Sequence, residues 1–409
     1  MQSFGIVYTL AWRNLWRNHR RTLIMIAAVT VGVWAMIFMT ALMRGMVDQM
    51  VVDGVRSLPG HVQVHNPLFQ DDPTVSNVMD TPESLLLDKA ASVNAVAWTS
   101  RIKVPGVISS ERESRGVTIF GIDPAREEGL SYIFNDIDEG RYLDSVDDKG
   151  LLIGKKLADT LETELGKRVV LMSQDPENEI ADRGFRVVGI FDSKLESFEE
   201  TQVFIAKRTA QKLLKVEDRT SELVFLGDNY RDVSSLLAEV QSVFDDSLKI
   251  EPWYELDSYL GTMLEVMDGF VLVWIVVIFL ALSFGLVNTL VMAVFERVRE
   301  IGLMLALGMR PALILSQIVV ESLLLLIIGL FAGNVLALVT IKPLEDGIDI
   351  SVVGEGMEMF GAASVLYPQL NVSDMVLATT VVLVLGFIAS LSPAWRASRY
   401  QPIEAITKA

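Results

Sequence analysis

Four long apolar runs interrupt the alternation of hydrophobic and polar positions along this chain of 409 residues. The runs cover 22–43, 269–295, 312–340 and 375–395, and the first two contain no charged residue. A helix needs roughly 20 residues to cross the hydrocarbon core of a bilayer, and each run approaches or exceeds that length. The pattern predicts an integral membrane α-helical protein with four transmembrane helices, placed at 22–45, 269–295, 311–341 and 374–395.

The region between the first two spans, residues 46–268, has a different pattern. Short stretches alternate between apolar and polar positions, as half-buried strands do, and helical segments separate them. Strands are expected at 60–65, 101–107 and 117–122, near 151, and at 168–172, 185–191, 202–205 and 222–226; helices are expected at 85–96, 155–165, 209–214 and 233–244. We predict a large extracytoplasmic α/β domain inserted between helices 1 and 2, with an outer subdomain at 123–219.

Both ends of this domain have an amphipathic helical pattern. Met46 and Met50 continue the apolar spacing of the first span, and Leu256, Leu260 and Leu264 recur at helical spacing before the second span. Two amphipathic helices at the two ends of one domain are expected to pack together as stalks. They would join the domain rigidly to the membrane helices.

Charge is distributed unevenly along the chain. Residues 46–268 hold 42 acidic and 23 basic residues, so the net charge of −17 belongs to the inserted domain. Such a domain repels nucleic acid, which argues against DNA binding. Ten of the twelve other basic residues flank the spans on one side, and only Arg44 and Lys342 lie opposite. The positive-inside rule then predicts that both chain termini are cytoplasmic.

This orientation assigns the shorter segments. Residues 1–21 carry Trp12 and Trp16 among arginines and are expected to form a helix in the cytoplasmic interface. Residues 296–310 form a cytoplasmic turn, and 396–409 a cytoplasmic tail. Residues 342–373 form an exterior loop with an apolar portion at Met357 to Phe360.

The sequence lacks the common motifs of catalysis and metal binding. It has no phosphate-binding G-x-x-x-x-G-K-[ST] loop, no H-E-x-x-H motif, no nucleophile elbow and no cysteine. His61 and His65 lie in a predicted strand, where their spacing puts them about 13 Å apart, too far to hold one ion. We interpret this segment as a solvated strand, and we expect no cofactor or metal in this chain.

The most specific signal is the turn between the second and third spans. Glu296, Arg297, Arg299 and Glu300 place four charges in five positions, directly before Ile301. A plain cytoplasmic turn would need arginines but no glutamates. Alternating charges around apolar positions favour a short amphipathic helix that docks in a groove of another protein.

Glu321 is an ionisable residue about ten positions inside the third span. Such a group is costly in a bilayer and usually faces protein or water. It either snorkels toward the interface or hydrogen-bonds to a neighbouring helix, or it takes part directly in transport or coupling. Gly329, Gly333 and Asn334 further along this span suit close helix packing.

At this point the chain resembles a known family. The segment NTLVMAVFERVREIGLMLALGMRP is similar to the coupling segment of FtsX-like ABC permeases, which include MacB-type exporters and the lipoprotein-releasing permeases of the Lol system. The resemblance extends to LAWRNLWRNHRRTLI, to IVVESLLLLIIGLFAGNVL and to SPAWRASRYQPIEAI. The order of one span, a large exterior domain and three further spans also matches.

The resemblance implies a permease subunit in a bacterial inner membrane that works with a separate cytoplasmic ATPase, which binds ATP and magnesium. The positions that match the family's ATPase-contacting coupling helix are Glu296, Arg297, Arg299, Glu300, Ile301 and Gly302. It also implies pairing with an identical or homologous permease, contact with membrane lipids and an amphiphilic substrate, of which lipoprotein is the leading candidate. A periplasmic carrier for the substrate is a further possible partner.

Two other functions compete with transport. A conformational change of the exterior domain, driven by the ATPase, could instead activate an exterior enzyme such as a cell-wall hydrolase without moving any solute. A cavity between the first two spans, open sideways to lipid, would favour transport over such a lever. A membrane-anchored receptor that works without an ATPase is the third alternative.

Overall fold

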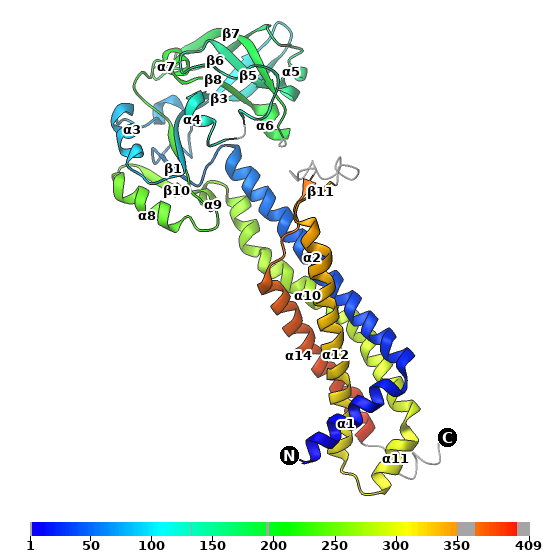
Figure 1. The fold of residues 1–409 in the computed structure, drawn as a ribbon. Coiled ribbons are helices and arrows are strands. Elements are labelled where there is room, and N and C mark those ends of the chain that lie inside the picture. The colour runs from blue at the N-terminus through cyan, green and yellow to red at the C-terminus, as the bar shows by residue number, and fades with distance from the viewer. Residues whose placement is uncertain (1, 132, 194–195, 350–364, 399–409) are drawn as a thin grey trace. The chain divides into compact units, whose positions relative to one another are not determined.

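A computed structural model describes residues 2–131, 133–193, 196–349 and 365–398 (Figure 1). The predicted apolar portion of the exterior loop at Met357 to Phe360 and residues 399–409 of the predicted tail at 396–409 lie outside these ranges. The chain divides into two compact units, and each is described by itself. The membrane unit comprises the described parts of 1–47, 266–349 and 365–409, and the strand unit comprises residues 48–265.

The membrane unit is built from long helices. They are α1 (Gln2–Arg17), α2 (His19–Ser57), α10 (Ser258–Glu296), α11 (Val298–Ala306), α12 (Pro311–Ile341) and α14 (Val372–Ser398). A short 3-10 turn, η2 (Lys342–Leu344), and a two-stranded ribbon of β11 (Ile348–Asp349) and β12 (Val365–Leu366) follow α12. The predicted spans fall in α2, α10, α12 and α14, which are long and apolar enough to cross a membrane.

Small residues let α12 approach its neighbours closely. A Cβ added at Gly329 would lie 2.6 Å from Val29 Cγ1, and one at Gly333 would lie 2.8 Å from Val33 Cβ, so the backbone of α12 lies directly against valine side chains of α2. Asn334 donates from Nδ2 to Thr379 Oγ1 of α14 at 3.1 Å. The predicted role of these three α12 residues in helix packing is confirmed.

The strand unit contains one ten-stranded sheet in two parts. Four strands form the base in the order β10-β1-β9-β2: β10 (Lys249–Pro252), β1 (Val62–His65), β9 (Glu222–Leu226) and β2 (Ala97–Ser109). Helices α3 (Glu83–Ala91) and α8 (Ser234–Val243) contribute to an apolar core with one face of this base. The other short elements of the base are η1 (Val75–Asn77) and α9 (Trp253–Leu256).

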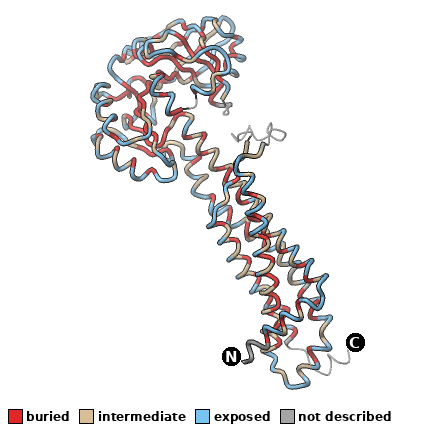
Figure 2. Tube along the Cα trace, viewed as in Figure 1, coloured by how far each residue is buried: buried red, intermediate tan, exposed pale blue. Residues whose placement is uncertain are grey.

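The second part of the sheet closes on itself. Its strands pair in the cycle β2-β3-β8-β5-β7-β6-β2, which forms a six-stranded barrel. The added strands are β3 (Ser114–Ile122), β5 (Gly150–Gly154), β6 (Arg168–Gln174), β7 (Ile180–Phe191) and β8 (Gln202–Ala206). Apolar side chains such as Ile119, Leu171 and Val203 fill its core, and long stretches of the strands are buried (red in Figure 2). Closure leaves these strands without a free edge.

Strand β2 belongs to both parts of the sheet. Residues 97–101 pair with β9 in the base, and residues 102–109 pair with β3 in the barrel. The predicted outer subdomain at 123–219 therefore does not coincide with the barrel, because β2 and β3 precede that range. The expected α/β domain contains both element types, but its core is a barrel-like sheet.

Most elements of the strand unit were predicted from the sequence. Every expected strand is present, and the four expected helices correspond to α3, α5 (Lys155–Thr160), α7 (Lys207–Leu213) and α8. The elements that were missed are β4 (Ile137–Gly140), β10, α4 (Pro124–Glu127), α6 (Glu196–Thr201), η1 and α9. Each of them has only three to six residues, too few to display a period.

The two predicted stalks touch within the strand unit. Gly54 of α2 lies against the Leu260 side chain of α10, so that a Cβ at this glycine would overlap it. Both stalks are also tied to the base sheet. Gly60, with φ +66°, turns the chain after α2, and Trp253 donates its backbone N–H to His61 O at 3.0 Å. Their rigid connection to the membrane helices stays a prediction.

His65 lies in strand β1 and His61 lies directly before it, but the interpretation of this segment as a solvated strand was wrong. His61 and His65 are both buried. Burial lowers the pKa of His61 to about 4, and its Nδ1 accepts a hydrogen bond from the backbone N–H of Gly227 at 2.9 Å. His65 Nε2 lies 3.0 Å from Glu251 Oε2 of β10. Polar residues on one sheet face can be buried when their partners come from neighbouring strands.

A fully buried arginine connects the elements of this unit. Arg101 of β2 donates from Nε and Nη2 to the two carboxylate oxygens of Glu127 in α4, at 3.0 and 2.5 Å. Its Nη1 donates to the carbonyl of Leu58, just after α2, and to Glu222 of β9 at 3.4 Å. One guanidinium therefore joins the barrel, the base and the end of α2.

Replacing Arg101 should destabilise the strand unit strongly. Arg101→Met leaves Glu127 as an unpaired buried charge, so we expect a loss of roughly 3–5 kcal/mol in the free energy of unfolding. Replacing the three charged residues together by apolar ones should cost less, because no charge is then left unpaired. Thermal unfolding and hydrogen exchange of β2 and β9 in the full-length protein measure both effects.

The matched control is Arg115→Met, which removes an exposed arginine from neighbouring β3. It should change the unfolding free energy by no more than about 0.5 kcal/mol. Equal losses for the two arginine variants would contradict the assigned role of Arg101.

Candidate functional site

The predicted turn contains a short helix between two breaks in the chain. Helix α10 ends at Glu296, and Arg297 takes a non-helical conformation with φ −112° and ψ 9° before α11 begins. After α11, Gly308 adopts φ +89°, which glycine tolerates without strain, and Pro311 starts α12 at a position where no backbone N–H is needed. These local signals turn the chain back toward the next span.

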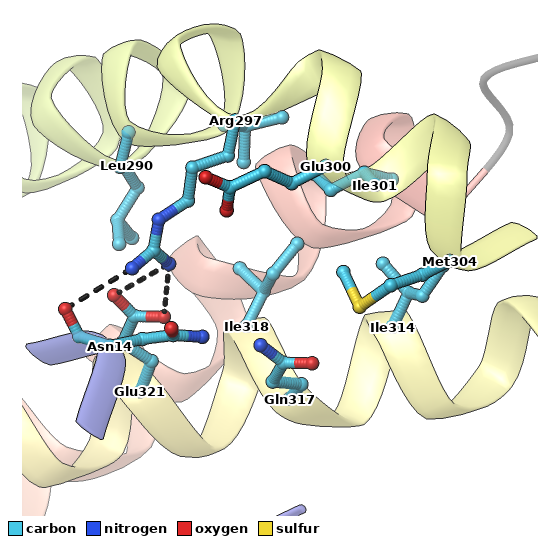
Figure 3. Close-up of a pocket in the computed structure, with 12 residues that line it drawn as sticks. Asn14, Leu290, Arg297, Glu300, Ile301, Met304, Ile314, Gln317, Ile318 and Glu321 are labelled. Atoms are coloured by element: carbon cyan, nitrogen blue, oxygen red, sulfur yellow. Dashed lines mark hydrogen bonds and ion pairs between the residues drawn. The ribbon is translucent and has the colours of Figure 1, made fainter. Parts of the chain in front are cut away.

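Arg297 points into the membrane unit and meets the ionisable residue of the third span. Its Nη1 donates to Glu321 Oε2 at 3.0 Å and to Oε1 at 3.3 Å, and its Nη2 donates to the carbonyl of Asn14 in α1 at 3.1 Å (Figure 3). Both charged side chains are largely buried. The pair therefore connects α1, the turn and α12 through one guanidinium.

Two further ion pairs hold the turn from the side of α1 and α2. Glu300 Oε2 of α11 accepts from Arg17 Nη1 at 3.0 Å, and Glu296 Oε2 at the end of α10 accepts from Arg21 Nη1 at 2.7 Å. The carboxylates of both pairs are half exposed, so each bond alone contributes little to stability. Together with Arg297 they fix the direction in which α11 leaves the bundle.

The inner face of α11 is apolar and buried. Ile301 packs in a cluster with Val294 of α10, Ile314 of α12 and Ala397 of α14, and Gly302 beside it is also buried. A small cavity lies between this face and α12, and Gln317 lines it. Within the part of the chain that the structure describes, Gln317 Oε1 has no hydrogen-bond partner. The turn is thus held by packing as well as by charge.

The outer face of α11 presents a different surface. Arg299 and Leu303 of α11 and Leu307, which caps its carboxyl end, follow one another at intervals of four residues, and all three are exposed. The two leucines expose 56% and 81% of their surface. A basic residue beside exposed leucines on one helix face is the pattern of a helix that docks into a groove.

The predicted site residues therefore divide between two faces. Arg297, Ile301 and Gly302 lie on the inner side of the turn. Glu321 accepts a hydrogen bond from Arg297, and bonding to a neighbouring segment was one of its two predicted roles. Arg299 points outward, and Glu296 and Glu300 lie at the flanks in ion pairs. The structure does not test their predicted contact with an ATPase.

Sequence reasoning missed the partners supplied by the first two helices. Asn14, Arg17 and Arg21 were interpreted as part of a basic anchor, although they bond to the turn. The sequence did contain a signal for these bonds: the amino-terminal segment carries arginines, and the turn between the second and third spans carries glutamates. Among the described residues, no group of three or more His, Asp or Glu residues could hold a metal ion.

Comparison with known proteins assigns this architecture to a class. Residues 22–243 match the model of the MacB-like periplasmic core domain, and residues 272–402 match that of the FtsX-like permease C-terminal. The chain therefore belongs to the MacB- and FtsX-like family of ABC transporter permeases.

Individual relatives have low sequence identity to this chain but align with most of its length. The lipoprotein-releasing system transmembrane protein LolC of Xylella fastidiosa (strain 9a5c) is 26% identical over 302 residues, covering 70% of this chain and 71% of its own. LolC of Neisseria meningitidis serogroup B is 23% identical over 403 residues, 94% of this chain and 93% of its own. The pyoverdine export ATP-binding/permease protein PvdT of Pseudomonas syringae pv. tomato is 24% identical, covering 97% of this chain and 58% of its own.

Breaking the inward ion pair should destabilise the membrane unit. Arg297→Met leaves Glu321 unpaired among apolar side chains, and we expect a loss of roughly 3–5 kcal/mol of stability. Arg297→Met combined with Glu321→Leu should recover most of this loss, since neither charge remains. Thermal unfolding in lipid nanodiscs measures both variants.

Arg299→Met serves as the control, because it removes an exposed arginine from the same helix. It should leave the unfolding temperature within about 1 °C of the unmodified protein. A double variant as unstable as Arg297→Met alone would show that the stability does not come from the ion pair.

Proposed function

We propose that this chain is the permease subunit of an ABC transporter in a bacterial inner membrane, and that a separate cytoplasmic ATPase drives it. ATP hydrolysis would change the conformation of the extracytoplasmic domain and so release or export an amphiphilic substrate, for which we propose a lipoprotein. The observation that carries this proposal is the two-sided α11, which is fixed to the bundle on one face and exposes Arg299, Leu303 and Leu307 on the other.

The contacts of the turn suggest how motion would leave it. An ATPase that holds the outer face of α11 would move Arg297, and through it Glu321 of α12. The pairs of Glu296 with Arg21 and Glu300 with Arg17 would carry the same displacement to α2 and α1. ATP can drive such a change only if the ATPase binds the turn differently in its two nucleotide states.

The orientation follows from the same assignment. If α11 contacts a cytoplasmic ATPase, then both chain termini are cytoplasmic and residues 48–265 are outside. The positive-inside distribution of arginines supports this topology. The relatives named LolC and the exposed apolar surface of α10 support an amphiphilic substrate and a second permease subunit beside this one.

Weakening the outer face of α11 should separate ATP hydrolysis from export. Arg299→Ala with Leu303→Ala removes two adjacent contacts, each worth at least about 1 kcal/mol if they are central to the interface. We expect roughly tenfold or greater loss of affinity for the ATPase, with normal membrane insertion. Copurification, ATP hydrolysis and substrate release in proteoliposomes measure the three steps.

The control is Met292→Ala, which truncates an exposed apolar residue of α10 outside the turn. It should leave ATPase binding unchanged. Full ATPase binding and full export by the α11 variant would exclude this surface as the coupling site.

The substrate class needs its own experiment. Depletion of the protein in its native cell should retain lipoproteins in the inner membrane, because release is the step that it would drive. The comparison is depletion followed by complementation with the α11 variant, which should not restore release. Normal lipoprotein distribution together with loss of an extracytoplasmic hydrolase activity would favour the transducer function instead.

A further inference from the structure

A cavity lies in the strand unit where α9 meets the first turns of α10. It has a volume of about 530 Å³, within the range of roughly 300–1,000 Å³ that small-molecule sites occupy. The loop before α8 contributes Tyr230 and Arg231 to its lining, and α9 and α10 contribute the remaining residues. We call it the α9–α10 cavity. It shares no residue with the coupling turn, so its role is a separate question.

Close contacts fix the lining of the α9–α10 cavity. Trp253, the buried first residue of α9, donates from Nε1 to the carbonyl of Tyr230 at 2.8 Å. The rings of these two residues meet edge-on, with centroids 6.0 Å apart. Gly261 of α10 lies so close to α9 that an added Cβ would be 2.6 Å from the carbonyl oxygen of Tyr254. The loop, α9 and α10 therefore hold the cavity in shape without a ligand.

The loop side of the cavity supplies hydrogen-bond donors. Arg231 donates from Nη2 to Asp48 Oδ1 of α2 at 2.5 Å, which positions its guanidinium and leaves further N–H groups for a ligand. The hydroxyl of Tyr230 is buried and has no hydrogen-bond partner within the described part of the chain. A buried hydroxyl without a partner is costly, so this group indicates that a ligand or a water molecule binds here.

The helical side of the cavity supplies acceptors. Glu255 of α9 and Glu265 of α10 both line it, and both are exposed. An ionised carboxylate accepts several hydrogen bonds and donates none. Donors on the loop side and acceptors on the helical side suit a zwitterionic ligand, which carries an anion at one end and a cation with N–H groups at the other.

The position of the cavity along α10 matches the headgroup layer of a bilayer. Glu265 comes four residues before the apolar run that begins at 269, and α10 is one continuous helix. With a rise of about 1.5 Å per residue, this spacing corresponds to about 6 Å. The headgroup region of one leaflet is roughly 5–8 Å thick. Tyr254 in the lining and Tyr259 next to it are exposed, and tyrosines are enriched at this depth.

We propose that the α9–α10 cavity binds the phosphoethanolamine headgroup of a membrane phospholipid. The phosphate accepts from Arg231 and from the Tyr230 hydroxyl, and the ammonium group donates to Glu255 and Glu265. A choline headgroup has no N–H to donate, and a glycerol headgroup has no cation, so both fit this lining less well. The bound headgroup joins the loop to α9 and α10. This site does not depend on the substrate that the protein transports.

The test compares lipids that differ only in their headgroup. Full-length protein in detergent is titrated with dioctanoyl phosphatidylethanolamine, phosphatidylcholine or phosphatidylglycerol, and native mass spectrometry gives each dissociation constant. Because the acyl chains are identical, unspecific binding to the apolar spans cancels in the ratio of these constants. Phosphatidylethanolamine should bind about tenfold more tightly than the other two, since only its ammonium group donates to the carboxylates. Equal affinities would overturn the proposal.

Removing the acceptors should abolish the preference for this headgroup. Glu255→Gln combined with Glu265→Gln keeps the size of both side chains and removes their charge. Phosphatidylethanolamine should then bind about as weakly as phosphatidylcholine. The control is Glu200→Gln combined with Glu217→Gln, which neutralises two exposed glutamates of the strand unit outside the cavity. A preference that survives the first double variant, or disappears in the second, would contradict the assigned site.

Removing a phosphate donor should give a different result. Tyr230→Phe deletes only the hydroxyl, so it should weaken binding of all three lipids by a similar factor of about five, because each of them carries the phosphate. Tyr259→Phe removes the hydroxyl of an exposed tyrosine that does not line the cavity, and it should change nothing. Unchanged binding in Tyr230→Phe would exclude this hydroxyl as the phosphate ligand.

A last arm distinguishes the lipid from a soluble source of the same chemistry. Phosphoethanolamine without acyl chains should compete with the lipid only at concentrations at least about 100-fold higher, because it lacks the apolar chains. Equal affinity for the soluble compound would assign the cavity to a small molecule in solution and contradict the lipid. The α11 variant should bind the lipid normally, so a failure of coupling and a failure of this site are separate results.

Discussion

The ion pair of Arg297 with Glu321 is the constraint on which the membrane unit depends. A carboxylate among apolar side chains of a transmembrane helix is costly unless a cation approaches it. Arg297 can reach Glu321 only because α10 stops one residue earlier and the chain bends there. The bend then sets the start of α11 and the return into α12. The same arginine also donates to the carbonyl of Asn14. The side chain that neutralises Glu321 therefore also holds α1 in place.

The elements were easier to predict from the sequence than their partners. Hydrophobic length located the four spans, and alternation located strands such as β6 and β9, because both signals are local. Strand pairing is not local: β2 pairs with β9 in one half and with β3 in the other, across more than 100 residues for β9. Nothing in the alternation of residues 97–109 shows that the strand passes from an open sheet into a closed barrel.

The candidate site illustrates the same limit for charges. The density of Glu296, Arg297, Arg299 and Glu300 indicated a docking helix, yet it could not show which of them point inward. Arg297 and Arg299 are two residues apart, and the helical break between α10 and α11 gives them opposite environments. Arginines near the amino terminus satisfied the positive-inside rule without any partner, so their bonds to Glu296 and Glu300 could not be inferred from it.

Helix α2 explains how these local pairs act together. It is held by acidic partners at both ends of its apolar run, with Arg21 bound to Glu296 and Arg44 bound to Asp374 and Asp268. Between these ends a branched side chain lies against a glycine at each contact with α10 and α12: Leu282 lies against Gly32, and Val29 and Val33 lie against Gly329 and Gly333. The small residues allow the helices to approach closely, and the side chains that fill the notches hold them in register. The ionic ends and these contacts therefore fix α2 against its neighbours both at its ends and in its middle.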